Sequence, residues 1–128
     1  MSMNVLAIAL LIQSLPAPGA AQWEPLGPPQ DGTTNAIDPA SIARTGDRAA
    51  FRMRSVRAVA DPEGMTTAII AFTIDCRART ATLEGVDLYR ADGSFGRSVG
   101  GDDPRPIGSD PMQRALFQRV CRTAPPAQ

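Results

Sequence analysis

Residues 67–76, TAIIAFTIDC, carry the clearest strand pattern in the chain. Every second side chain is apolar, and together these side chains form a face that contains Ala68, Ile70, Phe72, Ile74 and Cys76. The opposite face is smaller or more polar, apart from Ile69. A period of two predicts a half-buried antiparallel strand. The phase of this strand directs Cys76 toward the core.

Residues 110–121, DPMQRALFQRVC, predict an amphipathic helix. Asp110 can act as the N-cap, Pro111 occupies the first helical position, and Gln113 completes a capping-box pattern. An apolar stripe at helical spacing contains Met112, Leu116, Phe117, Val120 and Cys121. We therefore expect the helix to pack this stripe against the apolar face of the sheet.

The first 21 residues are uncharged and predict a signal peptide over residues 1–21. An unbroken apolar run, Val5 to Ile12, is followed by small residues that include Gly19 and Ala21, which favours cleavage before Gln22. A membrane-spanning helix needs about 20 apolar residues. The run is too short for that, so we expect no stable membrane span after cleavage. The alternative interpretation is a buried N-terminal core segment.

Cys76 and Cys121 are the only two cysteines. An even number of cysteines in a short exported chain favours a disulfide over metal binding or catalysis. A bridge between the strand and the helix would satisfy both apolar patterns, because each cysteine lies on or beside the face that is expected to be buried. The alternative is a redox-active thiol, although the spacing is unlike that of a CxxC pair.

The rest of residues 22–128 predicts a single domain. Shorter strand patterns occupy residues 23–27, 33–37 and 47–59, and residues 81–88 supply one or two more strands. Residues 96–108, rich in Gly, Asp and Pro, are predicted to be a loop. The fold class is therefore α+β: a single antiparallel sheet of about five or six strands, with a C-terminal helix packed on one face and joined to it by the disulfide.

Composition argues against most enzyme classes. The 128 residues contain 13 basic and 13 acidic side chains, every basic one is Arg, and His is absent. A chain without His cannot build a Ser-His-Asp or Cys-His site, and two cysteines are too few for a thiolate-only zinc site. Zero net charge argues against nucleic-acid binding. We predict no catalysis, no cofactor and no metal site; adjacent Asp102 and Asp103 suggest a weak Ca²⁺ contact at best.

The segment from Arg44 to Arg57 contains five Arg and one Asp. Alternation places Arg48, Arg52 and Arg54 on one face of a strand, and guanidinium groups suit phosphate, sulfate and carboxylate. These three residues are a candidate binding face for an anionic envelope polymer or an acidic partner protein. The alternative is a solvated face paired with nearby carboxylates. Trp23 and Tyr89 are expected to cover the core or a hairpin, and strand edges near Trp23 also allow a homodimer.

Several landmarks, read in order, resemble the surface-adhesin protein E-like family of small exported bacterial proteins. They are Trp23 with Leu26 and Gly27, Asp38 with Ser41, Ile42 and Arg44, then Asp75, Cys76, Arg79, Tyr89, Leu116, Val120 and Cys121. The resemblance spans essentially all of residues 22–128. It implies a sheet with a disulfide-tied C-terminal helix and a place in the Gram-negative envelope, either in the periplasm or at the cell surface.

Two functions follow from the residues and the resemblance together. The first is an exported interaction module that binds a protein or an envelope polymer, as family members named adhesins bind extracellular proteins of a host. The second is a small structural or accessory periplasmic protein without a dedicated ligand. The founding type of the family is lipid-anchored through a Cys, whereas the predicted export signal here contains none.

Overall fold

A computed structural model describes residues 22–122 of the chain. The predicted signal peptide, residues 1–21, therefore lies outside the described residues. The elements are β1 (Glu24–Pro25), β2 (Thr33–Ile37), the 3-10 turn η1 (Pro39–Ser41), β3 (Ala43–Thr45), β4 (Arg48–Arg57), β5 (Met65–Asp75), β6 (Thr80–Arg90), β7 (Phe95–Gly100), β8 (Arg105–Pro106) and α2 (Pro111–Arg122).

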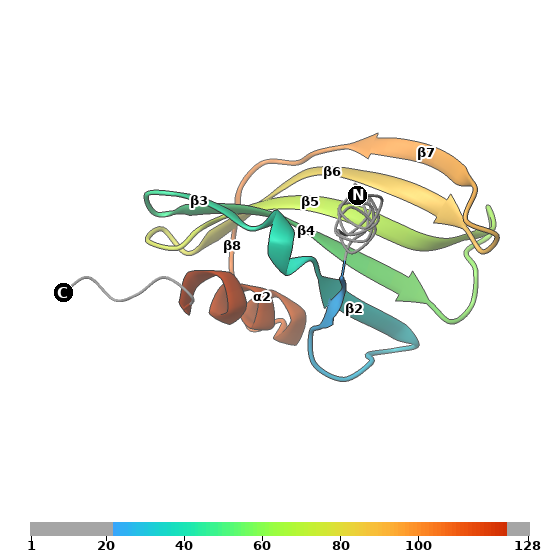
Figure 1. The fold of residues 1–128 in the computed structure, drawn as a ribbon, viewed down its shortest axis with the longest axis horizontal. Helices are drawn as coiled ribbons and strands as arrows, with labels where there is room; N and C mark the ends of the chain where they lie inside the picture. The colour runs from blue at the N-terminus through green and yellow to red at the C-terminus, as the bar shows by residue number, and fades with distance from the viewer. Residues whose placement is uncertain (1–21, 123–128) are drawn as a thin grey trace, which may run out of the picture.

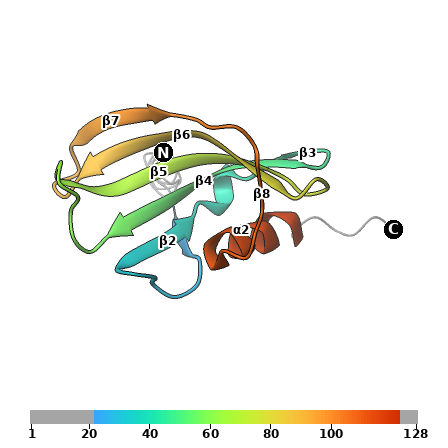
Figure 2. The ribbon, with the colours of Figure 1, turned by 180° about the vertical axis from the view of Figure 1, so that it is seen from behind.

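The strands form one antiparallel sheet, and α2 packs against it at the end where β3 and β8 lie (Figures 1 and 2). The strand order is β1-β2-β4-β5-β6-β7, while β3 pairs with β4 and β8 pairs with β6. This arrangement confirms the predicted fold class. Within residues 22–122 the sheet has eight strands rather than five or six, because β3, β7 and β8 were not predicted as strands.

The prediction of a loop over residues 96–108 was wrong in part. Phe95–Gly100 forms the edge strand β7, and Arg105–Pro106 forms β8. Both strands pair with β6 through backbone hydrogen bonds, which do not need apolar side chains. The Gly-rich composition lowers strand propensity but does not prevent pairing at an edge.

Alternate side chains of β4 point to the two opposite faces of the sheet. Ala49, Phe51 and Met53 are buried, while Arg48 and Arg52 are exposed. Pairing with β5 continues without a break from Arg48 to Val56, so this alternation carries across both strands. We call the face that α2 covers the inner face and the opposite one the outer face.

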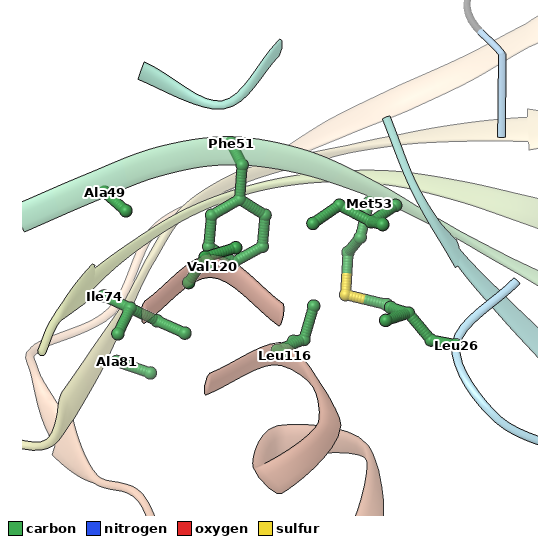
Figure 3. Packing of buried hydrophobic residues seen from close by; sticks show 9 residues of the cluster. Leu26, Ala49, Phe51, Met53, Ile74, Ala81, Leu116 and Val120 are labelled. Atoms are coloured by element: carbon green, nitrogen blue, oxygen red, sulfur yellow. The ribbon is translucent and has the colours of Figure 1, made fainter. Parts of the chain in front are cut away.

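The core lies between the inner face and α2. Figure 3 shows Phe51 and Met53 of β4 directed toward the helix, with Leu26 beside Met53. From the helix, Leu116 and Val120 are 2% and 0% exposed. The remaining members of this buried cluster are Ile37, Ala49, Ile74 and Ala81. Asp110 accepts a hydrogen bond from the Gln113 backbone N–H at 2.9 Å, which confirms the predicted N-cap.

Three polar or covalent links hold α2 on the sheet. The disulfide joins Cys76, directly after β5, to Cys121 of α2, with the two Cα atoms 5.7 Å apart. The Arg44 side chain of β3 donates a hydrogen bond to the Val120 carbonyl. Arg119 pairs with Glu24 of β1, with 2.5 Å between Nε and Oε2. The links reach three different strand segments, so they fix both the position and the orientation of the helix.

The Glu24–Arg119 pair predicts a small loss of stability in acid. The hydrogen bond from Arg119 lowers the pKa of the Glu24 carboxyl below its ordinary value. A depressed carboxyl pKa stabilises the fold above the unfolded-state pKa, and this contribution is lost as the pH falls through the folded-state pKa. Because the Glu24 side chain is 41% exposed, solvent screening limits the effect to less than about 1 kcal/mol.

The comparison that checks this is urea unfolding of the wild type and Glu24→Gln at about pH 6 and about pH 3, on either side of the ordinary glutamate pKa. The wild type should be the more stable protein at the higher pH, and the difference should shrink at the lower pH. A difference that does not change with pH would contradict the assigned pKa direction.

Candidate binding face

A shallow groove of about 540 Å³ lies on the outer face of the sheet. Its lining comes from residues before β1 and from β4, β5, β6 and β7. The lining residues are Trp23, Arg52, Ile69, Ala71, Glu84, Gly85, Val86, Asp87, Tyr89, Ser98 and Val99. The groove therefore crosses the strands on the side that α2 leaves uncovered.

The hollow exists because small residues meet in the middle of the sheet. Ala71 of β5 lies between Arg52 of β4 and Gly85 of β6 in the strand register. Ala71 and Gly85 fill little of the space above the backbone, so they form the floor of the groove. A register shift between Ala71 and Phe72 leaves Glu84 as an extra residue of β6 at this point, and Glu84 also lines the groove.

Two aromatic residues line the groove. The Arg54 guanidinium lies over the ring of Trp23, with Cζ 5.0 Å from the ring centroid. Tyr89 meets Phe95 of β7 edge to face, with ring centroids 5.7 Å apart. Each contact restricts its aromatic ring, so both rings are positioned by neighbours. Trp23 and Tyr89 are half-buried, and they line the groove rather than the core beneath α2.

The polar side chains of the groove are held by hydrogen bonds. Arg52 pairs with Asp38, with 2.8 Å between Nη2 and Oδ2, and the Asp38 side chain is only 4% exposed. Thr73 donates a 2.7 Å hydrogen bond to Glu84. Ser98 donates a 2.5 Å hydrogen bond to Asp87. One guanidinium and two carboxylates thus line the groove in defined positions.

The predicted Arg face is only partly assembled at this groove. Arg48, Arg52 and Arg54 share the outer face of β4, as the alternation predicts. Arg52 lines the groove, Arg54 stacks on Trp23, and Arg48 lies four residues from Arg52, about 13 Å along the strand. Arg52 also has a carboxylate partner, which agrees with the alternative of a paired sheet face.

Glu84, Gly85 and Asp87 did not emerge from the sequence as candidate site residues. They meet Arg52 and Trp23 only through the pairing of β4, β5 and β6, which no single-strand pattern encodes. Among residues 22–122, no group of three His, Cys, Asp or Glu side chains is placed to hold a metal ion. In that same range, no helix is both long enough and apolar enough to cross a membrane.

Comparison with known proteins agrees with this fold. A family model described as surface-adhesin protein E matches residues 23–122. No curated protein gives a significant match. Crystal form II of Haemophilus influenzae protein E has a TM-score of 0.55 and 13% sequence identity, over 82% of this chain and 98% of that chain. The selenomethionine form of that protein gives a TM-score of 0.51 and 15% identity, over 77% and 95% of the two chains.

Proposed function

The chain belongs to the surface-adhesin protein E family, and from this membership we propose that it is an exported, non-catalytic envelope protein whose outer sheet face binds a partner. The groove of about 540 Å³ is the observation that supports this proposal, because its volume falls in the range of about 300–1,000 Å³ that is usual for ligand sites. Its side chains combine aromatic surface with oriented polar groups, as binding sites commonly do.

Export is supported by the cysteine chemistry. The Cys76–Cys121 disulfide crosses from β5 to α2. Disulfides of this kind form and persist in oxidising compartments such as the periplasm or the cell exterior. Together with the predicted signal peptide over residues 1–21, this favours a mature protein of residues 22–128 in the envelope or at the cell surface. A homodimer through the β1 edge stays a prediction.

The non-catalytic part of the proposal is supported by the arrangement of the carboxylates. Glu84 and Asp87 each accept a hydrogen bond from a hydroxyl group, and Arg52 is paired with Asp38. A general acid or base works from a position where it can exchange a proton with a bound substrate at a suitable pKa. Charged groups whose positions are fixed by hydrogen bonds within the protein suit recognition of a ligand better than proton transfer to it.

Affinity capture from an envelope extract tests the proposed function. The immobilised wild type should retain envelope material that the triple variant Arg48→Ala, Arg52→Ala, Arg54→Ala retains much less. A variant with Ala at Arg77, Arg105 and Arg114 removes the same charge elsewhere and should behave as the wild type. Equal recovery by all three proteins would favour the alternative, a structural or accessory protein without a dedicated ligand.

Loss of Arg52 leaves the buried Asp38 carboxylate without its partner, which can destabilise the fold by about 1–3 kcal/mol. The double variant Arg48→Ala, Arg54→Ala keeps that ion pair and separates lost binding from lost folding. We expect the double variant to capture less envelope material, because Arg54 holds Trp23 beside the groove. Its melting temperature should be unchanged, because the ion pair of Asp38 is kept.

A further inference from the structure

The ligand class can be read from the charge of the groove. Its lining contains one guanidinium, Arg52, and two carboxylates, Glu84 and Asp87. The Arg52 charge is already compensated by Asp38. Arg54, which stacks on Trp23, brings only one further positive charge near the groove. A polyanion would meet no excess of positive charge here, so the groove favours a ligand without net negative charge.

The polar groups of the groove match hydroxyl groups. A hydroxyl both donates and accepts hydrogen bonds. The carboxylates of Glu84 and Asp87 accept such bonds, and the guanidinium of Arg52 donates them. Thr73 donates one hydrogen bond to Glu84, and Ser98 donates one to Asp87. The remaining oxygen lone pairs of the two carboxylates are still available for further donors. A ligand with several neighbouring hydroxyl groups would use donors and acceptors together.

The apolar surface of the groove matches a flat ring. Trp23 and Tyr89 are held by Arg54 and Phe95, respectively. Aromatic faces carry negative partial charge and attract the weakly positive C–H groups of a sugar ring. The low floor at Ala71 and Gly85 leaves room for such a ring.

We infer that the groove binds an uncharged saccharide unit, with Trp23 and Tyr89 packing on sugar rings and Arg52, Glu84 and Asp87 contacting their hydroxyl groups. This inference rests on the proposed function and narrows it, because it names the part of a glycan or glycosylated partner that the outer face recognises.

Trp23 provides the readout, since it is the only tryptophan of the chain. The test is a fluorescence titration of the mature protein with triacetylchitotriose and maltotriose as neutral probes, a heparin-derived tetrasaccharide as the anionic probe, and tetralysine as the cationic probe. At least one neutral sugar should change the Trp23 emission in a saturable way and bind at least tenfold more tightly than either charged probe.

Gly85→Leu is the decisive variant because it fills the floor of the groove and removes no polar or aromatic group. A Cβ atom at Gly85 would lie 3.6 Å from the Val99 carbonyl oxygen, an ordinary contact, so the strand can accept a side chain there. We expect at least tenfold weaker sugar binding. Ala71→Leu provides a second way of filling the floor, and Gly108→Leu, which lies in open space away from the groove, is the control.

Sugar binding that survives both Gly85→Leu and Ala71→Leu in folded protein would overturn the inference, as would tighter binding of heparin or tetralysine. If no sugar binds but envelope capture still depends on Arg48 and Arg54, the saccharide inference fails and the proposed function stands. If neither sugars nor envelope material are retained, both fail.

Discussion

Replacing both Cys76 and Cys121 with Ala is expected to lower the free energy of unfolding by about 4 kcal/mol. The bridge closes a loop with a sequence separation of 45 residues. In the chain-entropy description, a cross-link over a loop of this length restricts the unfolded chain and thereby stabilises the folded one. A domain of this size has only about 5–15 kcal/mol of net stability, so a large fraction of the total depends on one bond.

The folded structure should change little, because α2 keeps its other attachments. Arg44 still contacts the Val120 carbonyl, Arg119 still pairs with Glu24, and Leu116 and Val120 remain in the core. Urea unfolding should therefore show a lower midpoint, while circular dichroism of the native protein is nearly unchanged. Reduction of the wild type should give a similar loss.

A loss below about 1 kcal/mol would contradict this account of the disulfide, because the entropic contribution of a loop this long should exceed the effect of an ordinary surface substitution. A native protein without helical signal would show instead that the bond, and not the packing of α2, holds the helix in place.

Leu116→Ala is expected to destabilise the protein by about 3 kcal/mol, within the range of about 2–5 kcal/mol known for buried Leu. Leu116 is 2% exposed and belongs to the cluster that joins α2 to β4 and β5 (Figure 3). The substitution removes apolar atoms from the contact between helix and sheet and leaves a cavity that the disulfide-tied helix can only partly close.

Gln118→Ala is the matched control, since Gln118 lies on the exposed side of the same helix. Its effect should stay within about 0.5 kcal/mol, as for most surface substitutions. Thermal or urea unfolding of the two variants measures the difference. Equal stability of Leu116→Ala and Gln118→Ala would mean that the helix does not bury the stripe described above.

The features that the sequence predicted are those that depend on local periodicity. The period of two in residues 67–76 identified β5, and the apolar stripe after Asp110 identified α2. The two cysteines then fixed how these elements meet, because Cys76 and Cys121 are the only pair available. In such a small domain, packing an apolar strand face on an apolar helix stripe leaves few possible arrangements of the helix on the sheet.

Strand β6 shows where local periodicity fails. Its apolar pattern changes phase between Leu83 and Val86, and for that reason the pattern is compatible with either one strand or two. The structure has one strand, and the extra residue Glu84 absorbs the change of phase: Phe72 faces Leu83, whereas Ala71 faces Gly85. A bulge adds one residue to one strand without ending the pairing, so the sequence pattern breaks while the strand continues.

The groove could not be predicted because it depends on pairing between strands. Ala71 and Gly85 are unremarkable in their own strands, and only their register makes a hollow. Arg52 was identified from its alternation in β4, but its partner Asp38 lies after β2, and that contact alters the charge of the face. The sequence therefore predicts a row of positive Arg side chains, whereas in the fold the positive and negative charges of this surface nearly cancel.

The most direct test of the account asks which face of the molecule touches its partner. The photoreactive residue benzoylphenylalanine is introduced at Tyr89 in the groove or at Gln118 on α2, and each protein is irradiated in intact cells that produce it. Binding by the outer face predicts strong cross-linking of envelope material from position 89 and little from position 118. Cross-linking mainly from position 118, or none from position 89 in a correctly folded protein, would contradict the claim that the sheet face opposite α2 is the binding surface.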